Sequence, residues 1–234
     1  MPRRPKPEPL VQIREAALPA PLFHRLERGV RALGTRGIRR TYETTFWFDL
    51  AERPAALPEL AVVSLRSVFR EAGARGVEWW LSRMWTHDVQ VDFHRDRDER
   101  LALAGGPDRP PRVSSVLFLN RVRGGVLAVT RQAPDPRNPA MVPLPLEADL
   151  VAPQPNRFVT FDGRLTHGVL DARSAIPTSR LRRRGELRLT LVMNAWARRP
   201  TDVPTFEEAG AYAALRLRPE RGRLRPLRAW GDGP

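Results

Sequence analysis

The chain has 234 residues, a formal net charge of +14 and no cysteine. This length suits one domain with appendages, or two small domains at most, and 41% hydrophobic with 28% charged residues is a globular composition, not a disordered or collagen-like one. The missing cysteine excludes disulfide scaffolds, thiolate metal sites and a cysteine nucleophile, so any metal must bind to His, Asp or Glu.

The 40 basic residues are spread along the whole chain, and only Lys6 among them is lysine. Dense arginine runs at 182–184 and 216–228 are the best argument for a nucleic-acid partner, but they lack the interleaved aromatic residues of a single-strand binder. We therefore expect no nucleic-acid partner. Apolar runs stay below the roughly 18 residues of a membrane span, and the charged amino terminus has no apolar segment behind it, so we expect a cytoplasmic protein without a membrane anchor.

The 24 prolines favour turns and extended segments over a helical bundle, so we expect a mainly β (α+β) fold. Residues 1–20 are rich in Pro and Arg and are expected to form a flexible arm. Apolar residues at helical spacing then predict one helix that ends near Gly34 and another over about 58–74. A strand is expected over 42–50, whereas 77–85, with three tryptophans, fits a helix or a strand.

From about residue 86, short β-branched or alternating runs are broken by Pro, Gly and Asn, which is typical of an antiparallel sandwich or barrel. The expected strands are 88–94, 113–119, 126–130, 157–161, 166–170 and 186–196. Thr205 and Glu208 have capping-box spacing and predict a short helix through about Leu215. The expected organisation is a flexible arm over 1–20, a helical support over 21–85, a β core over 86–200, and a C-terminal helix with a basic tail over 201–234.

Two segments carry histidine and aspartate at strand spacing. In VQVDFHRDRDE, alternation separates an apolar face from a polar one, with Val89, Val91 and Phe93 on the first and Gln90, Asp92, His94 and Asp96 on the second. Taken alone, this row is more typical of the solvated face of a sheet than of a metal site. A second segment, NRFVTFDGRLTHGV, turns at Asp162 and Gly163 and delivers His167 to another strand. Two His and one carboxylate can occupy one face of an octahedral metal, as in non-haem Fe(II) oxygenases.

A third segment, GELRLTLVMNAW, directs Arg188 to the less apolar face of a strand, with Thr190 two residues further on. A buried guanidinium needs an anion, and its planar fork suits a carboxylate. A dicarboxylic co-substrate would supply one, and so would a salt bridge to Glu186. Both interpretations stay open.

Taken in order, these residues resemble the Fe(II)/2-oxoglutarate-dependent oxygenases, most closely the prolyl 4-hydroxylase-like branch. The resemblance spans about residues 86–198 and includes FHRD, SSVLFLNRVRGG, NRFVTFDGRLTHGV, and Gly185 ahead of Arg188. It implies a double-stranded β-helix (jelly roll) whose larger sheet is covered by N-terminal supporting helices. It also implies a set of site residues: the iron ligands His94, Asp96 and His167, the 2-oxoglutarate partner Arg188, and its helper Thr190.

The activity implied by this resemblance is hydroxylation of an unactivated C–H with Fe(II), 2-oxoglutarate and O2, releasing succinate and CO2. The substrate would be an amino acid, a peptidyl residue or a natural-product intermediate. Asp96 favours hydroxylation, since halogenating relatives lack this carboxylate. Alternatives from other classes are a non-catalytic jelly-roll binding module and a basic nucleic-acid-binding protein, and the oligomeric state is open.

Other residues are alternative candidates for the 2-oxoglutarate partner and for the metal-binding carboxylate. The segment between His167 and Arg188 is longer than the usual hairpin, so a loop arginine is an alternative carboxylate partner, namely Arg182, Arg183 or Arg184. Asp98 is a spare carboxylate, although its offset from His94 suits a strand less well than that of Asp96. His24 and His87 are expected to be structural. Trp79, Trp80 and Trp85 are expected to pack in the core or to line a substrate entrance. Arg131 and Arg137 belong to the loop 131–156, which is expected to form a mobile cover.

Overall fold

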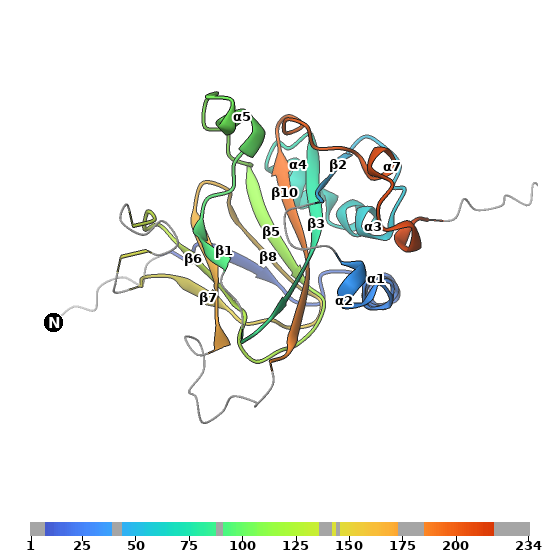
Figure 1. The fold of residues 1–234 in the computed structure, drawn as a ribbon, viewed down its shortest axis with the longest axis horizontal. Coiled ribbons are helices and arrows are strands. Elements are labelled where there is room, and N and C mark those ends of the chain that lie inside the picture. The colour runs from blue at the N-terminus through green and yellow to red at the C-terminus, as the bar shows by residue number, and fades with distance from the viewer. Residues whose placement is uncertain are drawn as a thin grey trace, which may run out of the picture.

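A computed structural model describes residues 8–38, 44–87, 91–135, 142–143, 146–172 and 185–217. Within these residues, two antiparallel sheets face each other (Figure 1). The large sheet has the order β1-β8-β5-β10-β3-β2, with β1 (Val11–Arg14), β2 (Phe46–Asp49), β3 (Gly76–Trp85), β5 (Val113–Phe118), β8 (Arg157–Asp162) and β10 (Leu187–Trp196). The small sheet has the order β4-β9-β6-β7, with β4 (Val91–His94), β6 (Val126–Thr130), β7 (Asp149–Val151) and β9 (Thr166–Leu170).

From β3 onward the chain passes repeatedly between the two sheets. It goes from β3 to β4, back to β5, across to β6 and β7, back to β8, across to β9, and ends in β10. Each crossing places a strand of one sheet opposite a strand of the other, and this is the jelly-roll arrangement expected from the strand texture. The five strands predicted between 113 and 196 occur within one residue of their expected bounds.

Helices cover the outer face of the large sheet, as expected, and form a third layer (Figure 1). They are α1 (Ala20–Ala32), α2 (Gly34–Gly37), α3 (Leu57–Ser64) and α4 (Arg66–Glu71). Leu26, Ala61 and Phe69 of this layer are fully buried in one cluster with Leu191 and other outward side chains of β10 and β3. At about 25 cal/mol per Å² of apolar area, burial of this kind is the main stabilising term of the layer.

Alternation along β10 assigns its side chains to two environments. Leu189, Leu191 and Met193 belong to the core beneath the helices, whereas Arg188 and Asn194 line the space between the sheets. A separate core fills the rest of that space and is formed by Val116, Phe118, Leu127, Val129, Val151, Val159 and Phe161. The inner face of the large sheet is therefore part apolar and part polar, and the polar part is where a site can form.

Two strands, β1 and β7, lie where the sequence predicted none. β1 falls within the expected flexible arm: it pairs with β8, and Asp149 Oδ2 accepts the Leu10 and Val11 amides at 2.6 and 3.3 Å. β7 falls within the expected loop 131–156. Backbone pairing to distant strands stabilises these segments, and side-chain periodicity carries no signal for such pairing. β2 lies inside the strand expected over 42–50, and β3 shows that 77–85, which fitted a helix or a strand, is a strand.

The predicted helices are shorter than expected. The helix expected over 58–74 is divided at Leu65 into α3 and α4. The capping box of Thr205 and Glu208 is present, but α7 (Phe206–Ala209) ends at Gly210, whose φ of 62° lies in the left-handed region, and only a 3-10 turn, η2 (Ala213–Leu215), follows. A fifth short helix, α5 (Glu99–Leu103), was not predicted.

None of the described helices combines the length and the apolarity that crossing a bilayer requires. Parts of several predictions fall on residues 42–43, 88–90, 136–141, 182–184 and 218–234, which lie outside the described residues.

Candidate metal centre

Strands β4 and β9 bring the predicted triad together. His94 lies directly opposite His167 in the antiparallel pairing, and their ring centroids are 4.4 Å apart. Asp96 follows β4 by two residues: its Oδ1 is 3.6 Å from His94 Nε2, and its Oδ2 is 3.5 Å from His167 Nε2. One ligand atom from each of the three residues lies within 4.8 Å of the others. These distances suit three ligands of a single metal ion.

The pairing of β4 with β9 contains one irregularity that strict alternation does not predict. Val91 is opposite Val169 and His94 is opposite His167, so three steps along β4 match two along β9. The extra residue is a bulge, which re-aims the side chains that follow it. Phe93 is buried against Ala128 in a satellite core instead of facing His167.

Backbone carbonyls orient both imidazoles. His94 Nδ1 lies 2.8 Å from the Asp92 carbonyl oxygen, and His167 Nδ1 lies 3.2 Å from that of Leu165. When each Nδ1–H donates to its carbonyl, the lone pair of each Nε2 is directed toward Asp96, the arrangement that metal-binding histidines need. The carbonyls therefore select the tautomer that binds a metal.

Ser114 of β5 completes the support of the triad. Its hydroxyl donates to Asp96 Oδ2 at 2.5 Å, and the Asp96 side chain is only 9% exposed. Sequence reasoning missed this residue, although the polar start of the strand VSSVLF was the available signal. A ligand carboxylate held by a hydroxyl keeps its orientation when the metal is absent.

The triad also perturbs the pKa values of its members. Burial opposes ionisation of Asp96, but the nearby His167 and His94 and the Ser114 hydroxyl outweigh it and lower the pKa of that carboxyl. Burial likewise opposes protonation of His94, yet the adjacent carboxylate raises its pKa. For His167, burial dominates and lowers the pKa. A carboxylate and a neutral imidazole are the forms that bind a metal.

Arg188 lies between the sheets in the same narrow cavity as the triad. The cavity is lined by residues from both sheets, among them Arg188, His94, Asp96, His167, Phe161 and Val169. Arg188 is 2% exposed; its guanidinium is 5.1 Å from the centroid of the Phe118 ring and 3.7 Å from Met84 Sδ. The structure thus brings the predicted anion-binding residue and the predicted metal ligands to one cavity.

Two hydroxyls beside Arg188 have no hydrogen-bond partner among the described residues. They are Thr190 Oγ1 and Ser82 Oγ, both buried and at opposed positions of β10 and β3. Leaving a buried hydroxyl unpaired costs about 1–3 kcal/mol, so an acceptor bound there would relieve two such costs. A carboxylate fits these donors, and this donor set therefore suits a dicarboxylic co-substrate.

Gly125 makes room for Arg188. It has a φ of 61°, and a Cβ at this position would lie 2.7 Å from Arg188 Cδ. The last glycine of the segment SSVLFLNRVRGG therefore has a local role, because a larger residue there would displace the arginine side chain.

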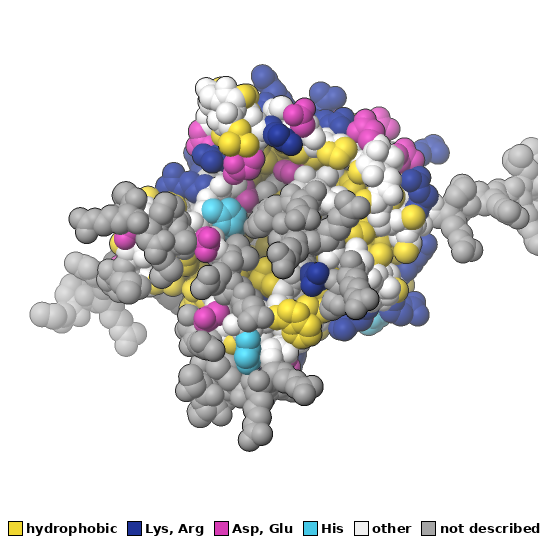
Figure 2. Space-filling model, viewed as in Figure 1, with side chains coloured by type: hydrophobic (Ala, Val, Ile, Leu, Met, Phe, Trp, Pro, Cys, Tyr) yellow, Lys and Arg dark blue, Asp and Glu magenta, His cyan; other side chains and the backbone are white. Residues whose placement is uncertain are grey.

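An open cleft of about 510 Å³ reaches the triad from the side of α5. Glu78, Trp80 and Asn194 of the large sheet form part of its wall, together with His94 and Asp96. The upper end of the molecule in Figure 2, near α5, carries basic and acidic side chains interspersed.

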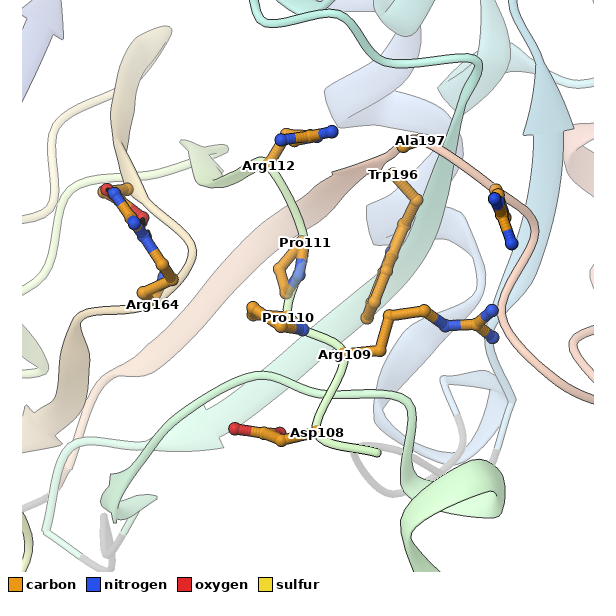
Figure 3. Close-up of a pocket in the computed structure, with 10 residues that line it drawn as sticks. Asp108, Arg109, Pro110, Pro111, Arg112, Arg164, Trp196 and Ala197 are labelled. Carbon is orange, nitrogen blue, oxygen red and sulfur yellow. Dashed lines mark hydrogen bonds and ion pairs between the residues drawn. The ribbon is translucent and has the colours of Figure 1, made fainter. Parts of the chain in front are cut away.

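A different cleft lies beside Trp196, next to Pro110 and Pro111 (Figure 3). Arg109, Arg112 and Arg164 are among its lining residues, but none of the triad residues is.

The other residues singled out in the sequence lie outside the triad. His24 is exposed on α1, and His87 packs near Gly185. Asp98 is buried, forms an ion pair with Arg109, and accepts hydrogen bonds from the amides of Leu101 and Thr201, so it caps α5.

The three tryptophans have three environments. Trp79 stacks on Phe46 in the outer core at 4.4 Å, Trp80 lines the cleft and the cavity, and Trp85 is 45% exposed.

Comparison with known proteins supports the fold. No family model matches the sequence, and no curated protein matches it at a significant level. Among solved structures, a prolyl-4-hydroxylase of Pseudomonas putida is similar with a TM-score of 0.51 at 18% identity, over 81% of this chain and 94% of that one. EctD of S. alaskensis, solved with 2-oxoglutarate and 5-hydroxyectoine, is similar with a TM-score of 0.50 at 17% identity, over 86% and 77%. This likeness confirms the expected double-stranded β-helix.

Proposed function

We propose that this protein is an Fe(II)- and 2-oxoglutarate-dependent dioxygenase that hydroxylates an unactivated C–H of a small molecule or a peptidyl residue. The convergence of His94, Asp96 and His167 on one point, in the cavity that also holds Arg188, carries this proposal. The two similar structures add support, since one is a prolyl-4-hydroxylase and the other holds 2-oxoglutarate.

The triad would hold Fe(II) through two imidazole nitrogens and one carboxylate oxygen, a facial set that leaves positions for the co-substrate and O2. When bound, iron and 2-oxoglutarate supply the oxidation of the C–H by O2, with release of succinate and CO2. Asp96 as the third ligand favours hydroxylation, because a carboxylate then takes the place that halide needs.

The protein's own residues hold and orient the co-substrate. Arg188 would bind its distal carboxylate, and the hydroxyls of Thr190 and Ser82 would donate to the same group. The apolar side chains of Phe161 and Val169 exclude water from the cavity between this anchor and the triad. The substrate would enter through the open cleft beside His94.

An oxygen-dependent succinate assay after anaerobic loading with Fe(II) and 2-oxoglutarate tests the reaction. We expect succinate from the wild type, none above background from His94→Ala, and near wild-type amounts from His87→Ala, which removes a histidine outside the triad. Succinate that persists without His94 would refute the assignment.

A binding measurement tests the anchor separately. Calorimetric titration of the anaerobic protein with 2-oxoglutarate should show a large loss of affinity in Arg188→Ala. The matched variant Arg183→Ala, from the alternative arginine group at 182–184, should bind normally. The reverse result would transfer this role to the arginine group.

A further inference from the structure

The inner face of the large sheet carries polar side chains of opposite character at its two ends. β3 and β10 pair in register, with Arg188 opposite Met84, Thr190 opposite Ser82, Val192 opposite Trp80, and Asn194 opposite Glu78. Arg188 and Asn194 are six residues apart on an extended strand, which is roughly 20 Å. A guanidinium therefore lies at one end of this face and a carboxylate at the other, where the cleft opens.

Glu78 is an acidic residue in a strand that is otherwise mostly apolar. It lines the cleft beside the triad and is only part-exposed. Among the described residues it forms no ion pair with an arginine. Burial, and then the charges of Asp96 and Asp98, raise its pKa to about 7, although hydrogen bonds with the Thr45 and Trp196 side chains oppose them. This carboxylate is held away from water without a cation, which is costly unless a ligand supplies one.

Asn194 offers a second acceptor beside Glu78. The residue is 2% exposed, lines both the cleft and the cavity, and is in register with Glu78 on one side and Ser114 on the other. Its Oδ1 is buried and has no hydrogen-bond partner within the described ranges. A carboxylate and an unpaired amide oxygen on neighbouring strands both require hydrogen-bond donors, and donors are what a cationic nitrogen group provides.

Trp80 follows Glu78 on the same face of β3. Its indole is largely buried and lines the cleft where the cleft meets the cavity. Aromatic surfaces attract ammonium and guanidinium groups, so this side chain adds to the preference set by the two acceptors.

The arginines at the mouth of the cleft are more exposed than Glu78. Arg97 forms an ion pair with Glu99, and Arg95 donates to Thr166 Oγ1 at 3.4 Å. The inner wall of the cleft is therefore acidic while its rim is mixed.

We propose that this cleft selects substrates that carry a positively charged nitrogen, as an ammonium or guanidinium group, bound by Glu78 and Asn194. The proposal rests on the function proposed above and names its substrate class: the target C–H lies near the cationic group and faces the triad. The cation belongs either to a free amine or guanidine compound or to a Lys or Arg side chain of a peptide.

The test compares cations with neutral isosteres in ligand-observed NMR titrations of the metal-free protein at about pH 8, above the raised pKa of Glu78. Butylguanidine and butylurea represent a free compound. Nα-acetyl-arginine methylamide and its citrulline counterpart represent a peptide side chain. We expect at least one cation to bind about tenfold or more tightly than its neutral isostere, as a charged hydrogen bond provides. A larger affinity ratio for the butylguanidine pair identifies the substrate as a free compound, and a larger ratio for the acetyl-arginine pair identifies it as a peptide side chain.

Two variants assign the preference to Glu78. Glu78→Gln should remove it while leaving thermal unfolding cooperative, whereas Glu99→Gln, which removes an exposed carboxylate from the rim, should retain it. Glu78→Asp keeps the charge and should keep a reduced preference. Equal binding of cation and isostere by the wild type, or a preference that survives in Glu78→Gln, would overturn the proposal. These titrations need neither iron nor 2-oxoglutarate, so their failure is distinguishable from failure of the succinate assay.

Discussion

Replacing Glu78 by Gln should stabilise the metal-free protein in alkaline solution and leave its stability nearly unchanged in acid. Folding raises the pKa of this carboxyl from 4.5 to about 7, chiefly because the group is buried. Ionising the folded protein therefore costs more free energy than ionising the unfolded chain. The cost is absent below the unfolded pKa and complete above the folded one, so stability falls as pH rises through this window.

The shift sets the size of the effect. At about 1.4 kcal/mol per pKa unit, it corresponds to roughly 3 kcal/mol of lost stability above about pH 8. Solvent screening at this part-exposed side chain makes the value an upper bound, so we expect Glu78→Gln to gain about 1–3 kcal/mol there. Glutamine keeps an oxygen that can accept from Thr45, so the substitution removes the charge and little else.

Urea unfolding followed by tryptophan fluorescence, at about pH 4.5 and pH 8.5, measures this difference by linear extrapolation. EDTA keeps metal from the triad, whose Asp96 contributes to the shift of Glu78. An equal gain at both pH values would show that burial of the charge is not the cause. A loss at the higher pH would refute the reasoning altogether.

Three further substitutions should affect the site and its support. Gly125→Ala places a Cβ 2.7 Å from Arg188 Cδ, so calorimetric affinity for 2-oxoglutarate should fall while metal affinity is retained. Ser114→Ala removes the hydroxyl that holds Asp96, and metal titration should show about 10–100-fold weaker binding. Asp98→Ala removes the buried carboxylate that pairs with Arg109 and accepts from the Leu101 and Thr201 amides, and it should cost about 1–3 kcal/mol in urea unfolding. The pKa of Asp98 is lowered in the fold, so this loss should diminish as pH falls below about 4.

Each substitution has a matched control. Gly105 has a φ of 74° and open space around its missing Cβ, so Gly105→Ala measures backbone strain without displacing a side chain. Ser115 donates to the Met193 carbonyl instead of to a ligand, and Ser115→Ala should leave metal affinity unchanged. Asp162 forms an exposed ion pair with Arg164, and Asp162→Ala should cost less than about 1 kcal/mol. If a control variant changes the measured affinity or stability as much as its test variant does, the role assigned to the test residue is wrong.

The β core was predictable because its strands carry their own signal. The short β-branched and apolar runs at 126–130 and 166–170 gave bounds that the structure reproduces, because all residues of the first strand and the first three of the second are buried. β1 escaped prediction because the Asp149 carboxylate that accepts its amides lies far away along the chain. The division at Leu65 escaped for a similar reason, because helical periodicity continues across it.

The candidate site was predictable in its reactive groups and not in their supports. His94, Asp96 and His167 were identified by residue type and spacing, and scarcity of histidine narrowed the search. Ser114 and Glu78 were missed because a hydroxyl or a carboxylate in a strand becomes informative only when its neighbours across the sheets are known. The family resemblance implied 2-oxoglutarate as the co-substrate, but it did not indicate which side chains form the wall of the cleft.

The extra residue in β4 makes the centre depend on the register of the strand pair as well as on residue identity. His94 faces His167 only because three positions of one strand span two of the other. If regular pairing continued from Val91 and Val169, Phe93 would face His167, and His94 would lie one position further along, on the other face of the strand. The centre would thus be lost with every ligand still in the chain, an outcome that a scan of point substitutions at the ligands would never reveal.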